Sequence, residues 1–158
     1  MGGIVKAYVD GSYDKSTKLG GFGIVYLDED DNIVDFDGGI IENKPILSMW
    51  NVAGEITAAT TVLNKCRCEK IPSITIVYDY EGIGSWALGK WKGKNEFTKE
   101  YIETAKLVMY DVNVKFEHVK GHSGNVYNDI VDVIAKMSAR VRLKPNEIKL
   151  LDDYNIKI

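Results

Sequence analysis

Two aspartates each follow a hydrophobic segment, although they lie far apart in the chain. Asp10 follows residues 4–9 and Asp79 follows residues 73–78, and both segments have the composition of buried strands. The ends of parallel strands meet at one edge of a sheet, which is where open α/β sheets place their sites. Two carboxylates that meet there repel each other unless one holds a proton or a divalent cation lies between them. Oxygen ligands of this kind favour magnesium or manganese.

Two further carboxylates could join this pair. Glu55 lies near the start of a helix expected over residues 51–68, and Asp132 borders the apolar stripe of a helix expected over residues 125–141. A charge at such a border is costly unless it is paired or bound to a metal. Asp129 lies three positions before Asp132 and could share its face, so the spacing alone leaves that choice open. Four carboxylates suit two cations, about 3.5–4 Å apart, that clamp the attacking and leaving oxygens of a phosphoryl transfer.

Each carboxylate also has a simpler interpretation. An aspartate after a strand is commonly a turn residue or a helix cap. Glu55 could be a charge that the helix dipole favours near a helix start, and Asp132 could be a solvated helix residue. The elements that carry these residues must therefore decide whether the carboxylates meet.

The hydrophobic pattern predicts five strands and four main helices. The strands are expected at 4–10, 22–27, 33–41, 73–78 and 112–119, and the helices at 51–68, 81–90, 98–110 and 125–141. Short connections make the first three strands an antiparallel meander. The first helix then leads to the fourth strand, and such a crossover makes the first and fourth strands parallel and usually adjacent. Asp10 and Asp79 are therefore expected side by side, with Gly11 permitting a sharp bend after the first strand.

One domain is expected over residues 1–142, since a chain of 158 residues can bury one hydrophobic core. Residues 143–158 have the composition of a polar C-terminal tail, in which a short helix after Pro145 could pack on the domain. The net charge of −3 argues against binding polyanions by bulk charge, so any contact with nucleic acid needs a local patch.

The sequence also disfavours several other classes of protein. No apolar run reaches the length of about 18 residues that a membrane-spanning helix needs, and the N-terminus lacks the pattern of a secretory signal. Cys66 and Cys68 lie two apart on a predicted helix and so point to different faces, which disfavours a disulfide between them. The two histidines are too far away to complete a zinc site. A reducing, cytoplasmic setting is the expectation.

Five segments, in order, resemble the successive motifs of type 1 ribonuclease H. They are Tyr8-Val9-Asp10-Gly11-Ser12, Gly54-Glu55-Ile56-Thr57-Ala58-Ala59, Val77-Tyr78-Asp79-Tyr80, Val119-Lys120-Gly121-His122-Ser123-Gly124-Asn125, and Asn128 through Asp132 to Ala135. The resemblance covers nearly the whole chain to about Val141. It implies an α/β, ribonuclease H-like fold, with a five-stranded mixed sheet of three antiparallel strands then two parallel ones, flanked by helices. It also implies an enzyme that cleaves the RNA strand of RNA–DNA hybrids and leaves 5′-phosphate and 3′-hydroxyl ends.

The family's quartet of Asp, Glu, Asp and Asp corresponds to Asp10, Glu55, Asp79 and Asp132. The resemblance implies that this quartet binds two Mg²⁺ ions, with Mn²⁺ as a substitute. In the family the last aspartate follows a loop histidine by ten residues, which selects Asp132 and marks His122 as a further catalytic residue. A histidine on a glycine-flanked loop could move protons or help product leave. The alternative for His122 is a solvent-exposed loop residue.

Asn51, Gly11 and Ser12 are the candidates for contacting the RNA strand. Asn51 lies one helical turn before Glu55 and so on the same face, and in the family an asparagine there contacts the minor groove of the hybrid. The backbone of Gly11 and Ser12 could touch the RNA as well. Glu81 departs from the family pattern, which often has glutamine two residues after the third carboxylate. A carboxylate repels phosphate, so Glu81 is better explained as a charge at a helix start.

Trp91, Lys92 and Lys94 are the candidates for contacting the DNA strand, with Trp86 and Lys90 nearby. This is the densest basic and aromatic segment of the chain, and such surfaces bind nucleic-acid strands through charge and stacking. The alternative places the tryptophans in the core and the lysines in a solvated loop. The pattern does not decide between the two.

Asn128 could either support the start of the last helix or contact a phosphate.

Two other functions compete with the ribonuclease H prediction. A related DNA-directed nuclease, such as a junction resolvase or integrase, usually lacks a histidine loop like residues 120–124. An inactive nucleic-acid-binding domain would not need all four carboxylates. The expected partner is an RNA–DNA hybrid, with no membrane and no protein partner, and the chain is expected to be a monomer.

Overall fold

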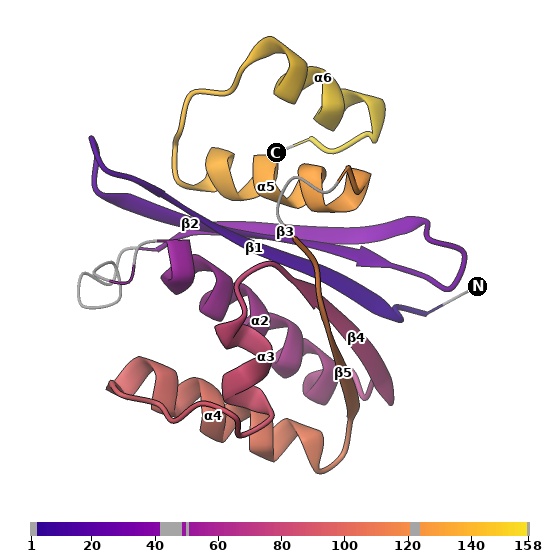
Figure 1. The fold of residues 1–158 in the computed structure, drawn as a ribbon. Coiled ribbons are helices and arrows are strands. Elements are labelled where there is room, and N and C mark those ends of the chain that lie inside the picture. The colour runs from indigo at the N-terminus through magenta and orange to yellow at the C-terminus, as the bar shows by residue number, and fades with distance from the viewer. Residues whose placement is uncertain (1–2, 42–48, 50, 121–123, 158) are drawn as a thin grey trace.

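Figure 1 shows a computed structural model of the protein, which describes residues 3–41, 49, 51–120 and 124–157. A five-stranded sheet runs in the order β3-β2-β1-β4-β5. Its strands are β1 (Lys6–Asp14), β2 (Leu19–Leu27), β3 (Ile33–Ile41), β4 (Ser73–Tyr78) and β5 (Asn113–His118). The first three pair antiparallel, whereas β4 pairs parallel with both β1 and β5. The predicted mixed sheet, with three antiparallel strands and two parallel ones, is confirmed.

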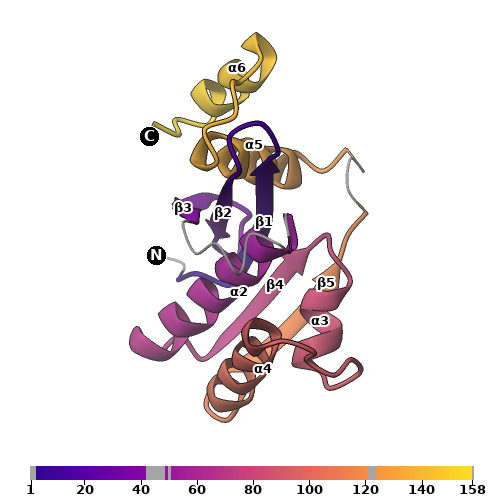
Figure 2. The ribbon, with the colours of Figure 1, turned by 90° about the vertical axis from the view of Figure 1, so that its left-hand side faces the viewer.

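Helices lie on both sides of the sheet, as Figures 1 and 2 show. One side carries α2 (Asn51–Cys68), α3 (Gly82–Ala87) and α4 (Glu96–Met109), and the other carries α5 (Val126–Ser138). A further helix, α6 (Pro145–Asp153), lies on the outer side of α5, away from the sheet. Among the described residues, no helix is long and apolar enough to cross a membrane.

β1 lies at the centre of the sheet and is covered on both faces. Ala7 and Val9 belong to the core shared with α2, whereas Tyr8 belongs to the core shared with α5. This alternation is what a pleated strand produces. At the far end of α2, Cys66 is buried and Cys68 is exposed, as expected of two residues that point to different faces of the helix.

Two glycines allow the start of α2 to approach the sheet closely. A methyl group on Gly11 would overlap the carbonyl oxygen of Asn51, and one on Gly54 would overlap the carbonyl oxygen of Gly21 on β2. The helix and strand backbones therefore touch here, which residues larger than glycine do not permit. This close approach places Glu55 of α2 at the same hollow as β1.

β1 does not end at Asp10, as the hydrophobic pattern predicts, but continues to Asp14. The bend expected at Gly11 is absent, because β1 keeps its antiparallel partner β2 over its whole length. The parallel ladder with β4 does stop early, with Tyr8 opposite Val77. Asp10 therefore lies just past the point where β1 and β4 cease to pair, at the edge where a side chain can face the end of β4.

The predicted helix over 81–90 is limited to α3, and α4 begins at Glu96 rather than at residue 98. The earlier start follows from a reciprocal cap. The Thr98 N–H donates to Asn95 Oδ1 at 2.8 Å, and the Asn95 N–H donates to the Thr98 hydroxyl at 3.3 Å. The residues between α3 and α4, including Trp91, consequently lie outside any helix.

The C-terminal segment packs on α5 through apolar side chains. Leu151 of α6 and Ile156 just after it are buried in the same cluster as Ile130 and Ile134 of α5. The short helix expected after Pro145 is therefore present, and the tail adds a layer outside the sheet and its helices.

Candidate active site

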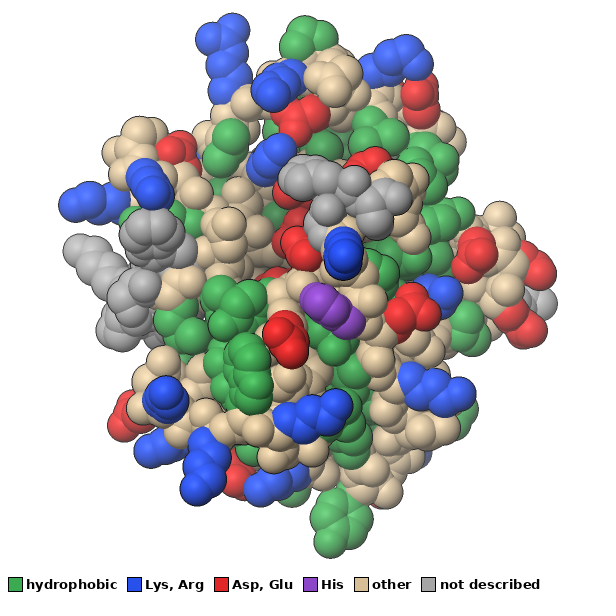
Figure 3. Space-filling model, viewed as in Figure 1, with side chains coloured by type: hydrophobic (Ala, Val, Ile, Leu, Met, Phe, Trp, Pro, Cys, Tyr) green, Lys and Arg blue, Asp and Glu red, His purple; other side chains and the backbone are tan. Residues whose placement is uncertain are grey.

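A hollow of about 590 Å³ lies at the edge of the sheet where β1 and β4 part; we call it the acidic hollow. Five carboxylates line it, of which Glu81 is one. The other four come from four different parts of the fold. They are Asp10 of β1, Glu55 of α2, Asp79 directly after β4 and Asp132 of α5. In Figure 3, acidic side chains are recessed near the middle of the visible face, close to the histidine drawn in purple. The structure thus brings the quartet predicted from the sequence to one place.

The surroundings of Asp10 oppose the ionised form of its carboxyl group. Burial, then the charges of Glu55 and Asp132, raise the pKa of Asp10 well above its usual range, and a hydrogen bond with Asp132 acts in the same direction. The N–H of Gly11 donates to Asp10 Oδ1 at 2.8 Å and partly offsets these effects. Asp10 therefore favours keeping a proton that an isolated aspartate would lose.

Glu55 is anchored by the backbone that follows β4. Its side chain is only 4% exposed, and its Oε1 accepts the N–H of Asp79 at 2.9 Å. The N–H of Tyr80 lies 3.2 Å from each of its oxygens. Burial raises the pKa of Glu55 to about 7, although these backbone hydrogen bonds lower it, and the charge of Asp79 adds to the rise. The Glu55 carboxylate thus ties α2 to the segment that carries Asp79.

His118 also contacts the backbone at Asp79, and the sequence analysis did not identify it as a site residue. Its Nε2 lies 2.6 Å from the carbonyl oxygen of Asp79. A carbonyl only accepts, so Nε2 carries the proton and donates it in this bond. His118 also lines the acidic hollow and stacks at 5.3 Å on Tyr78. The register of β5 against β4, which pairs His118 with Tyr78 at the end of β4, brings it to this place.

The donor set of the acidic hollow suits a hard divalent cation. The quartet offers only carboxylate oxygens, which Mg²⁺ and Mn²⁺ prefer. The raised pKa of Asp10 reflects its burial first and then repulsion by Glu55 and Asp132, and a bound cation would favour the ionised form against both. Within the part of the chain that the structure describes, no three Asp, Glu, His or Cys side chains are close enough to hold a cation as they stand. Asp132 instead bonds Lys136, with Oδ2 and Nζ 3.1 Å apart. The residues fit a cation in type and location once their side chains turn toward it.

The residues predicted to contact substrate are divided between two neighbouring hollows. Gly11 and Asn51 line the acidic hollow, and Trp91 borders both it and the next one. Lys92 and Lys94 line only the second hollow of these two, which has a volume of about 570 Å³. Ser12 is a partly buried residue of β1.

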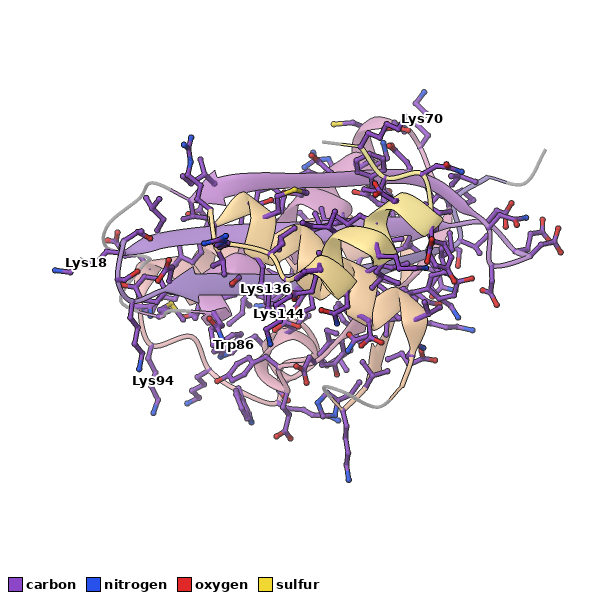
Figure 4. All side chains as sticks on the ribbon, turned by 90° about the horizontal axis from the view of Figure 1, so that it is seen from above. Lys18, Lys70, Trp86, Lys94, Lys136 and Lys144 are labelled. Carbon is purple, nitrogen blue, oxygen red and sulfur yellow. The ribbon has the colours of Figure 1, made fainter. Side chains whose placement is uncertain are left out.

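The second hollow is walled by an aromatic cluster; Tyr80, Trp86, Trp91, Lys92 and Lys94 are called the aromatic surface below. The Trp86 and Trp91 rings meet edge to face at 5.7 Å, and both contact Tyr80. Trp86 is 7% exposed and Trp91 is 38% exposed. The interpretation that places the tryptophans in the core therefore holds for Trp86. Trp91 presents a face to solvent, and its contact with a DNA strand stays a prediction. Figure 4 labels Trp86 and Lys94.

Asn125, rather than Asn128, supports the start of α5. Its Oδ1 accepts the N–H groups of Tyr127 at 2.9 Å and Asn128 at 3.2 Å, and its Nδ2 donates to the hydroxyl of Tyr8 on β1 at 3.0 Å. Asn128 itself is buried. Glu81 lines the acidic hollow just before α3 and makes no side-chain cap hydrogen bond there.

His122, like its neighbours Gly121 and Ser123, lies outside the described residues. Its predicted catalytic role therefore stays a prediction. The described part of the histidine loop ends at Lys120 and resumes at Gly124.

Comparison with known proteins decides the family. A family model described as RNase H matches residues 3–140. The chain belongs to the RNase H family. Membership confirms the predicted resemblance and the prediction of a ribonuclease H hydrolase at the level of the family. The matched segment ends before α6 begins at Pro145.

Curated relatives carry the same name. A protein of Cyanothece sp. (strain PCC 7425 / ATCC 29141) called Ribonuclease H is 28% identical over 150 residues, covering 88% of this chain and 91% of that protein. Ribonuclease H of Prochlorococcus marinus (strain NATL1A) is 29% identical over 163 residues, covering 96% and 94%. Ribonuclease H of Ehrlichia ruminantium (strain Gardel) is 30% identical over 146 residues, covering 84% and 92%.

Solved structures share the fold. RNase H1 from Halobacterium salinarum NRC-1 superposes with a TM-score of 0.69 at 19% identity, covering 86% of this chain and 97% of that one. LC11-RNase H1 in complex with an RNA/DNA hybrid has a TM-score of 0.69 at 20% identity, covering 85% and 96%. At these identities the likeness shows the fold, which is that of RNase H1 structures.

Proposed function

We propose that the protein hydrolyses the RNA strand of RNA–DNA hybrids and leaves 5′-phosphate and 3′-hydroxyl ends. The observation that carries the proposal is the meeting of four carboxylates, from four parts of the fold, in one hollow of an RNase H family chain. The similar LC11-RNase H1 structure contains an RNA/DNA hybrid, which supports the choice of substrate.

Asp10, Glu55, Asp79 and Asp132 are proposed to hold two Mg²⁺ ions, or Mn²⁺ in their place. When bound, such ions lower the pKa of water and stabilise charge on the attacking and leaving oxygens of a phosphodiester. Glu55 contributes a fixed position, because backbone N–H groups already orient its carboxylate. Asp10 contributes a carboxylate whose ionised form the protein alone disfavours, because burial and the charges of Glu55 and Asp132 raise its pKa.

The two strands of the hybrid would lie on either side of this centre. Asn51 and the backbone of Gly11 border the acidic hollow, and with Ser12 they are proposed to contact the RNA strand and its 2′-hydroxyl groups. Asn128 is proposed to contact a phosphate. Trp91, Lys92 and Lys94 are proposed to bind the DNA strand through stacking and phosphate contacts. This leaves the Trp86 ring as support behind Trp91.

His122 is proposed to carry protons between the reacting phosphate and solvent, or to help product leave. A neutral imidazole can accept and then return a proton near pH 7, which carboxylates of ordinary pKa cannot. Replacing His122 by Ala should lower kcat more than it raises KM, if the residue serves the chemistry rather than binding.

Strand-specific cleavage tests the proposed function. An RNA–DNA hybrid, a DNA duplex and an RNA duplex are each labelled on one strand at a time and incubated with the protein and Mg²⁺. We expect cleavage of the RNA strand of the hybrid only, and none with Asp79→Asn. Cleavage of DNA would point to a DNA-directed nuclease, and retention of the hybrid without cleavage would point to a binding domain; either result contradicts the proposal. Asp153→Asn, an exposed change on α6, is the matched control.

A further inference from the structure

One lysine links the acidic hollow to α6. Lys136 lies one helical turn after Asp132 on α5, and its Nζ is 3.1 Å from Asp132 Oδ2. The same Nζ is 3.0 Å from Glu147 Oε2 on α6. Figure 4, seen from above α6, labels Lys136 together with Lys144. A carboxylate of the proposed metal site is therefore joined, through one ammonium group, to a helix that lies beyond the segment matched by the family model.

Glu147 is held firmly in place. Its Oε1 accepts the N–H of Lys144 at 2.9 Å, which closes the cap at the start of α6, and its side chain is only 13% exposed. Leu151 and Ile156 bury the same segment against α5. The contrast on the same helix is the pair of Lys149 and Asp153, whose Lys149 side chain is 75% exposed. Exposed pairs of that kind have little influence on their surroundings, whereas Glu147 is a fixed anion.

The Lys136 ammonium group, which is paired with Asp132, competes with a metal ion for the same carboxylate. When Asp132 turns to a cation, Lys136 loses a partner and becomes a like charge near that cation. Glu147 offers the ammonium a second anion that is already in contact, so Lys136 need not be left unpaired. The position of α6 therefore influences how readily Asp132 is released.

We propose that Lys136 and Glu147 are positioning residues for Asp132: Lys136 restrains the carboxylate, and Glu147 of α6 shares that lysine and so makes Asp132 available to Mg²⁺. The inference rests on the proposed function, because it assumes that Asp132 ligates the ion. It assigns to α6 a role in metal binding at a site that α6 does not line.

The two residues should shift Mg²⁺ affinity in opposite directions. Lys136→Met removes both the competitor and a nearby positive charge, so we expect the Kd for Mg²⁺ to fall by about three- to tenfold. Glu147→Gln leaves Lys136 to Asp132 alone, so we expect the Kd to rise by about threefold. Once Lys136 is absent, Glu147→Gln should change the Kd very little, because the link between α6 and Asp132 is already gone.

Calorimetric titration of Mg²⁺ into the full chain tests this scheme without measuring turnover. The wild type is compared with Lys136→Met, Glu147→Gln and their combination, and Lys149→Met with Asp153→Asn serves as the matched control on α6. Opposite shifts of the Kd in the two single variants, with a Kd in the combined variant equal to that of Lys136→Met, support the proposed coupling of Asp132 to α6 through Lys136, which we call the relay. If Glu147→Gln changes the Kd equally with and without Lys136, Glu147 acts directly through its charge and the relay is overturned. Unchanged Kd values in all variants would overturn it as well.

Asp132→Asn separates failure of this inference from failure of the proposed function. If Asp132→Asn weakens Mg²⁺ binding while the Lys136 and Glu147 variants do not alter it, the metal site stands and the relay is wrong. If Asp132→Asn binds Mg²⁺ like the wild type, Asp132 is no ligand and both proposals fail.

Discussion

The acidic hollow and the aromatic surface share a border at Tyr80 and Trp91, yet they are built in opposite ways. The hollow gathers its carboxylates from four parts of the fold and fixes Glu55 with backbone hydrogen bonds. The aromatic surface comes from one short stretch of chain, and its lysines are exposed. Chemistry on a phosphodiester needs groups held in place against their mutual repulsion, whereas binding a strand tolerates mobile charge and an exposed ring. We therefore expect changes in the hollow to affect turnover and changes in the surface to affect binding.

Asp10→Asn should have the largest effect and should separate turnover from stability. We expect kcat to fall by roughly 10³-fold or more, because a proposed metal ligand is lost. Without metal, the variant should unfold at a higher temperature, since the carboxylate that Glu55 and Asp132 repel is replaced by a neutral amide. Each kcal/mol gained should raise Tm by roughly 2–4 °C for a chain of this size. Cleavage assays and calorimetric melting check the two halves, and a clear loss of stability would argue against a shared anionic site.

Alanine at the two tryptophans should divide the aromatic surface itself. Trp86→Ala should cost about 3–5 kcal/mol of stability, because a buried ring is lost. Trp91→Ala should leave Tm nearly unchanged but raise KM for the hybrid about tenfold, the value of one base stacked on an aromatic ring. Tyr110, which is 90% exposed at the C-terminal end of α4 and lines neither hollow, provides the control. If Tyr110→Ala raises KM as much as Trp91→Ala does, the surface has no special part in binding.

Glu55 should make the stability of the metal-free protein depend on pH. Its pKa is about 7 in the folded protein and 4.5 in its usual state, so the folded chain binds this proton more tightly than the unfolded chain does. The stabilisation is complete below the lower value and is lost as the pH rises through the higher one. We expect the urea concentration at the midpoint of unfolding to decrease as the pH rises from the lower pKa to the higher one. Glu55→Gln should make this decrease smaller. Asp153→Asn should leave the profile as it is, and an equally steep profile in Glu55→Gln would exclude this group as its source.

The smallest effect is expected from the lysines of the aromatic surface. Lys92→Gln with Lys94→Gln should weaken hybrid binding modestly at low salt and reduce the salt slope of log Kd by about 1.5, because two phosphates are no longer neutralised by the protein. Lys70→Gln with Lys115→Gln, two exposed lysines that line neither the acidic hollow nor the aromatic surface, is the control of equal charge. An identical change in slope for both pairs would mean that net charge alone governs binding.

The meeting of Asp10 and Asp79 could be predicted from connectivity, whereas the choice of Asp132 over Asp129 came from the family resemblance. A crossover helix makes β1 and β4 parallel neighbours, so Asp10 and Asp79 had to meet whatever the details of packing. The end of β1 was predicted wrongly because a glycine after an apolar run usually signals the end of a strand. The pairing of residues 11–14 with β2, which extends β1, is not visible in the local sequence. The structure was also needed to show that Trp86 is buried and Trp91 exposed, because the local sequence does not reveal which side chains pack over each ring.

Other parts of the site depend on contacts that no local pattern encodes. In the sequence, His118 alternates with charged residues in step with Val114 and Phe116, and only the register of β5 against β4 places it at Asp79. The bond from Lys136 to Glu147 depends on where α6 packs, and that is decided by a few apolar residues such as Leu151. Side chains that meet through tertiary packing are the part that sequence reasoning could not supply.

Analysis of the cleavage ends tests the central claim most directly. An RNA–DNA hybrid is incubated with the wild-type protein and Mg²⁺, and the RNA fragments are identified by mass spectrometry. Hydrolysis directed by the quartet predicts fragments with 5′-phosphate and 3′-hydroxyl ends, and none after Mg²⁺ is chelated. Intact RNA, or fragments with 2′,3′-cyclic phosphate ends that persist in chelator, would contradict the claim that Asp10, Glu55, Asp79 and Asp132 form the catalytic centre.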